Sequence, residues 1–68
     1  MTSRRFWTLA VRQSERFVPE FGSFVRGEAI AAMSEWRREG VRRANLKIVA
    51  SDPDLAAIER AIAALNST

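Results

Sequence analysis

The apolar and polar residues of the first quarter of the chain fit two different elements. The run FWTLAV alternates as a strand does, with Trp7, Leu9 and Val11 on one face. Over the longer window 3–18, the apolar residues share one broad arc of a helix and the arginines fill the other. The helical pattern fits a longer stretch than the strand pattern does, so we expect a helix here. Pro19 is expected to end it, because a proline disfavours helical backbone in the residue before it. A strand is the alternative.

The rest of the chain predicts two helices with a strand between them. The first helix runs from Ser23, as N-cap, to about Glu39, before a glycine stop. The segment NLKIVAS, residues 45–51, is short, β-branched at its centre and bounded by turn formers, which is typical of a strand. In the last segment, Asp52 is expected to cap a helix whose first position is Pro53.

These elements predict a mainly α fold with one short strand, a small three-helix domain that spans residues 1–68. If residues 6–12 form a strand instead, the fold becomes β-α-β-α. A lone strand has backbone donors and acceptors without partners. The strand at 45–51 must therefore pair with residues 6–12, with another copy of the chain, or with another protein.

Composition limits how so short a chain gains stability and what chemistry it can perform. A chain of 68 residues buries only about 60% of its unfolded surface. It has no cysteine and no histidine, so a disulfide is impossible and a zinc site is not expected; helix packing, a homodimer or a complex with another protein remains. With tyrosine also absent, we expect no enzyme, no metal and no cofactor. No run approaches the roughly 20 apolar residues of a membrane span, and we expect a cytoplasmic protein.

One segment, WRREGVRRANLK, carries five basic residues and one acidic residue, a formal charge of +4 against +3 for the whole chain. Such a segment is a candidate phosphate-binding surface, because arginine and lysine make charge-assisted contacts with phosphate. The candidate nucleic-acid-binding residues are Arg37, Arg38, Arg42, Arg43 and Lys47.

Trp36, at the start of this segment, has two interpretations. Beside the arginines it could stack on a base. The competing interpretation places it in the core, on the helix face of Ala29 and Met33, with the arginines at the negative end of a helix dipole and Glu39 paired with Arg43.

Two further patterns have structural and functional interpretations. Arg5, Arg12 and Arg16 are spaced by seven and four, which suits one solvated helix face or a second basic strip that joins the first. In the last helix, apolar residues recur at spacings of three, four and three, as in a coiled-coil seam. These candidate partner or dimer interface residues are Leu55, Ile58, Ile62 and Leu65. The alternative is that this face packs on the core of its own domain.

The segments FWTLAVR and GEAIAAM together resemble the ribbon-helix-helix DNA-binding family. The resemblance implies a strand that pairs across a dimer and reads the major groove, with Thr8, Ala10 and Arg12 on the reading face. It covers residues 6–39 at most, and Pro19 stands where the first helix of that family would run.

The sequence as a whole predicts a non-catalytic nucleic-acid-binding protein of the small regulator type. The alternative is a protein-interaction module, such as an accessory subunit, inhibitor or adaptor, that docks through its C-terminal helix.

Overall fold

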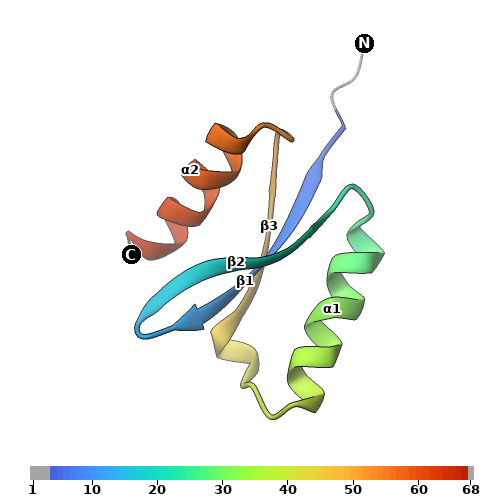
Figure 1. Ribbon diagram of the computed structural model, residues 1–68, viewed down its shortest axis with the longest axis vertical. Helices are drawn as coiled ribbons and strands as arrows, with labels where there is room; N and C mark the ends of the chain where they lie inside the picture. The colour runs from blue at the N-terminus through green and yellow to red at the C-terminus, as the bar shows by residue number, and fades with distance from the viewer. Residues whose placement is uncertain (1–3, 68) are drawn as a thin grey trace.

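The computed structural model describes residues 4–67, which form a three-stranded antiparallel sheet with two α-helices packed against it (Figure 1). In chain order the elements are β1 (Phe6–Gln13), β2 (Arg16–Ser23), α1 (Arg26–Arg38), the short 3₁₀ helix η1 (Arg43–Asn45), β3 (Leu46–Ser51) and α2 (Leu55–Asn66). The prediction of a mainly α, three-helix fold is wrong. The order is β-β-α-β-α, so the alternative β-α-β-α fold also lacks one strand.

The helix predicted over residues 3–18 is a β-hairpin instead; Ser3 itself lies outside the described residues. Two residues connect the strands, Ser14 at φ 51° and Glu15 at φ 70°. Two successive positive φ values match the type I′ turn, whose twist suits a two-residue hairpin. The window 3–18, whose periodicity predicts a helix, therefore spans parts of two strands that run in opposite directions.

β1 is the central strand, in the order β2-β1-β3, and pairs antiparallel with both neighbours. β2 and β3 consequently run in the same direction, and α1 crosses one face of the sheet to connect them (Figure 1). A bulge at Glu20 shifts the β1–β2 register between the pairs Leu9–Phe21 and Ala10–Pro19. Pro19 therefore does not end a helix but lies within an edge strand, where a missing N–H is tolerated.

Both faces of β1 are buried, each under a different helix. On one face Leu9, Val11 and Leu46 form the core cluster, against which Met33 and Trp36 of α1 pack. Alternation along the strand turns Thr8 and Ala10 to the other face. There α2 covers the sheet through its own buried residues, Ala57 and Ile62. This double burial explains why FWTLAV has apolar residues at positions that face either side of the sheet, with Thr8 as its one polar residue.

The predicted later elements are present, with corrected boundaries. β3 begins one residue after the predicted strand and ends with it, at Ser51. α1 begins at Arg26 after Val25 as N-cap, while the Ser23 hydroxyl accepts a hydrogen bond from the Val25 N–H. The α2 cap is Asp54, which accepts from the Ala57 N–H at 2.8 Å, and not Asp52. Pro53 accordingly lies before the cap.

The ribbon-helix-helix order of one strand followed by two helices is not the order of this chain, because a second strand follows β1 directly. Within residues 4–67, neither helix combines the length and the apolar character that crossing a membrane requires.

Candidate nucleic-acid interface

η1 and the C-terminal end of α1 lie at the lower end of the molecule's long axis, and the hairpin turn projects to one side in the lower part of the view (Figure 1). The register fixes part of this arrangement, because Val11 of β1 pairs with Leu46 of β3, so the hairpin extends beyond the start of β3. We call the cations on these segments the basic end. Its members are Arg12, Arg16, Arg37, Arg38, Arg42, Arg43 and Lys47.

Charge is unevenly distributed between the basic end and the rest of the chain. The basic end holds seven of the 11 basic residues, and only Glu15, Glu35 and Glu39 share its segments, which gives a formal charge of +4. The other four basic residues are outnumbered by five acidic ones. The net charge of +3 thus results from a positive end and a slightly negative remainder, the arrangement that attracts a polyanion to one end.

The cations of the basic end are largely without carboxylate partners. The one salt bridge among the described residues joins Arg38 Nη1 to Glu35 Oε1 at 2.9 Å. Both side chains are well exposed, at 75% and 66%, so the pair contributes little to stability and leaves the guanidinium open to a competing anion. The predicted Glu39–Arg43 pair is not formed. Arg42, Arg43 and Lys47 are exposed.

Trp36 belongs to the core and not to the basic surface. It is half-buried and packs against the Leu9, Val11 and Leu46 cluster. The core interpretation is therefore confirmed, and stacking of Trp36 on a base would require it to leave the sheet. Phe17 is the aromatic residue next to the arginines of the hairpin, since it follows Arg16 and pairs with Arg12; it is half-buried, and its backbone is bonded to Asn66.

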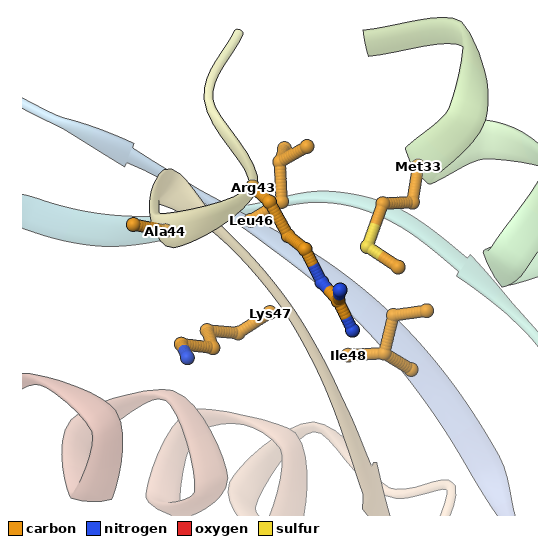
Figure 2. A pocket seen from close by; sticks show the side chains of 6 residues that line it. All are labelled: Met33, Arg43, Ala44, Leu46, Lys47 and Ile48. Carbon is orange, nitrogen blue, oxygen red and sulfur yellow. The ribbon is translucent and has the colours of Figure 1, made fainter. Parts of the chain in front are cut away.

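Arg43 and Lys47 lie on opposite sides of β3. Figure 2 shows the Arg43 side chain running along the strand toward Ile48, on the side of Met33, while Lys47 points the other way. The register agrees, because Lys47 pairs with Ala10 of the α2 face and Ile48 pairs with Leu9 of the α1 face. An open groove follows this stretch of chain, lined by Met33, Arg43, Ala44, Leu46, Lys47 and Ile48. Cations therefore lie on both sides of β3.

The hairpin adds to the basic end two arginines, Arg12 and Arg16, whose sequence spacing predicts a helix face shared with Arg5. Arg12 and Arg16 flank the turn, while Arg5 precedes β1 at the opposite end of the molecule. Arg12 lies two residues from Ala10, the partner of Lys47, and therefore faces the same side of the sheet as Lys47. Arg12 and Arg16 join the cations of residues 37–47 only because the chain forms a hairpin here. A helical spacing does not predict that they belong to the same surface.

Two cations remote from the basic end contact aromatic rings of the same chain. The Arg4 guanidinium lies 4.4 Å from the centre of the Phe24 ring, and that of Arg26 lies 5.6 Å from the Trp7 ring. Cation–π contacts of this kind hold an arginine against its own protein. The two ends of the molecule therefore differ: Arg4 and Arg26 are held against aromatic rings of their own chain, and no such contact is formed by the cations of the basic end among the described residues.

The candidate interface residues of α2 lie partly in the chain's own core. Ile62 is buried, Ile58 and Leu65 are half-buried, and Leu55 is 71% exposed. The structure therefore brings most of this seam onto the sheet and leaves its first residue open beside Phe21, which is 39% exposed.

Within residues 4–67, no group of three or more carboxylates is placed to hold a metal ion. The side chains of the basic end supply hydrogen-bond donors and positive charge and no acceptor.

Comparison with known protein families, curated proteins and solved structures finds no match to this chain.

Proposed function

We propose that this protein binds nucleic acid without catalysis, through contacts between the basic end and backbone phosphates. The observation that supports it is the exposure of seven cations at one end of the fold, of which Arg38 alone pairs with a carboxylate among the described residues. Cations already neutralised by their own protein would gain little from a phosphate. The cations of the basic end are not neutralised in this way and remain available to a phosphate.

The proposed mechanism is electrostatic positioning. Each phosphate neutralised by an arginine or lysine releases condensed counterions, which drives binding and makes it depend on salt. Arginine can also hold a phosphate through two parallel hydrogen bonds. Such contacts fix orientation without reading sequence, so any base preference must come from a partner or from a second copy. A cytoplasmic location is part of the same proposal.

The experiment compares two double variants that remove equal charge. Arg42→Gln with Arg43→Gln acts at the basic end, and Arg5→Gln with Arg60→Gln acts at exposed positions elsewhere. Fluorescence anisotropy measures binding to a labelled duplex and a labelled single strand at low salt. We expect the first variant to bind at least about tenfold more weakly, a loss of about 1.4 kcal/mol. The second should stay close to the wild type.

Equal losses in both variants would show that binding follows net charge and not the basic end. Absence of wild-type binding to both probes at low salt would reject the proposal outright. Circular dichroism on each variant checks that the fold is retained, which is expected because all four side chains are exposed.

A further inference from the structure

The two edges of the sheet differ in how they are protected from further strand pairing. At the β2 edge, the Asn66 side chain at the end of α2 binds the backbone of Phe17. Its Oδ1 accepts from the Phe17 N–H at 2.6 Å, and its Nδ2 donates to the Phe17 carbonyl at 3.0 Å. Two residues on, Pro19 has no N–H to offer. These are devices that block an edge strand.

The Asn66 contact also shows which backbone groups face outward elsewhere in the sheet. Successive residues in an antiparallel ladder direct their N–H and C=O groups to opposite sides. Because the groups of Phe17 point away from β1, those of its partner Arg12 point away from β2, as do those of Ala10. Ala10 therefore bonds to Lys47 of β3.

The same alternation leaves Leu46, Ile48 and Ala50 of β3 facing away from the sheet. The Leu46 N–H bonds to the Arg43 carbonyl. Although the Arg43 side chain runs toward Ile48, no side chain in the described part of the chain hydrogen-bonds the outward groups of Ile48 and Ala50 as Asn66 bonds those of Phe17. The groove that begins at Arg43 opens along this edge (Figure 2). β3 is therefore the open edge of the sheet.

We propose that the open edge of β3 pairs antiparallel with β3 of a second copy of the chain, to form a continuous six-stranded sheet. The charges at the two ends of β3 indicate that the pairing strand is another β3. Arg42 and Arg43 precede the strand, and Asp52 and Asp54 follow it. Antiparallel pairing brings the basic flank of each copy to the acidic flank of the other, whereas parallel pairing would place like charges together.

One register pairs every outward-facing residue of β3 with an outward-facing residue of the second copy. It places Ile48 opposite Ile48 of the second copy, on a two-fold axis, and Leu46 opposite Ala50. The Leu46 N–H keeps its bond to the Arg43 carbonyl, and the Leu46 carbonyl would accept from the Ala50 N–H of the second copy. Residues 43–45 form η1, so the ladder ends at Leu46; Asp52 of the second copy, two residues after its Ala50, would follow on toward η1 and Arg43. Pairing in this way is isologous, as is usual for homodimers. It also gives a 68-residue domain additional buried surface, which small domains lack.

The test is an exchange of charges across the proposed two-fold axis. Arg43→Glu and Asp52→Lys each put two like-charge contacts into the dimer, while an equimolar mixture of the two variants restores opposite charges at both contacts. Sedimentation velocity should show the wild type at twice the 7.7 kDa of the chain. Each variant alone should dissociate at least tenfold more readily, and the mixture should recover wild-type association.

Ala50→Pro tests the backbone contribution separately, since it removes an outward N–H and no bond to β1. It should yield a folded monomer. A wild type that stays monomeric at about 1 mM overturns the proposal, as does a mixture that associates no better than its components.

This inference does not rest on nucleic-acid binding, although both proposals use Arg43. The doubly substituted chain, with Arg43→Glu and Asp52→Lys together, separates them. It should recover dimerisation, because each introduced glutamate meets an introduced lysine, while its affinity for nucleic acid stays reduced at the basic end. Failure of one proposal therefore leaves the other measurable.

Discussion

The contact between Asn66 and Phe17 joins the last residue of α2 to the outer edge of β2, 49 residues earlier in the chain. Asn66→Ala removes both hydrogen bonds at once. The Phe17 N–H and C=O face away from β1, so no strand replaces the lost partner. Both groups are partly buried, and water reaches them incompletely. The substitution therefore reports how strongly one side chain holds α2 to the sheet.

The expected loss follows from these two bonds. A typical hydrogen bond contributes about 0.5–1.5 kcal/mol net, and a buried group left without a partner costs about 1–3 kcal/mol. Partial access of water places the total at about 2–3 kcal/mol. For a domain of this size each kcal/mol shifts Tm by about 4–8 °C, so Tm should fall by about 10–20 °C.

Thermal unfolding followed by circular dichroism measures this change. Ser67→Ala is the matched control, because the neighbouring Ser67 hydroxyl is exposed and bonds only to the carbonyl of Ala64, within the last turn. The control should stay within about 0.5 kcal/mol of the wild type. If Asn66→Ala is no more destabilising than the control, the contact does not hold in solution and the β2 edge is not closed as described.

Other substitutions test the packing of the sheet. Gly22→Ala should cost about 1–3 kcal/mol, because the added Cβ would lie 2.5 Å from the Phe6 ring; an unchanged Tm would contradict that close packing. Gly27→Ala in α1 meets nothing within 4 Å and should instead raise stability by up to about 1 kcal/mol, so the two glycine variants should melt on opposite sides of the wild type. Thr8→Val should gain about 1–2 kcal/mol in urea unfolding, since the Thr8 hydroxyl is buried without a partner among the described residues; a loss would show that the hydroxyl is bonded in solution.

The sequence predicts the second half of the fold far better than the first. The strand at β3 and the helix at α2 carry their own boundary signals, a short β-branched run and an Asp-Pro-Asp start. The hairpin carries none, because Ser14 and Glu15 adopt positive φ without the glycine or asparagine that would reveal it. With β1 buried on both faces, its alternation is also masked.

The basic end is predictable where its residues are neighbours in sequence and unpredictable where the fold brings them together. Arg42, Arg43 and Lys47 form one charged segment, and the sequence identifies it directly. Arg12 and Arg16 join them only through the hairpin turn. The hydrogen bonds between Asn66 and Phe17 have no local sequence signal, since they depend on tertiary contact between the first and last thirds of the chain.

The salt dependence of binding tests the central claim, that the cations of the basic end are free for phosphate. For duplex DNA the logarithm of the association constant falls with the logarithm of salt concentration by about 0.9 per neutralised phosphate. Seven engaged cations predict a slope of about −6.3 for the wild type and about −4.5 for the Arg42→Gln, Arg43→Gln variant. Equal slopes for the two proteins, or wild-type binding that does not respond to salt, would contradict the account.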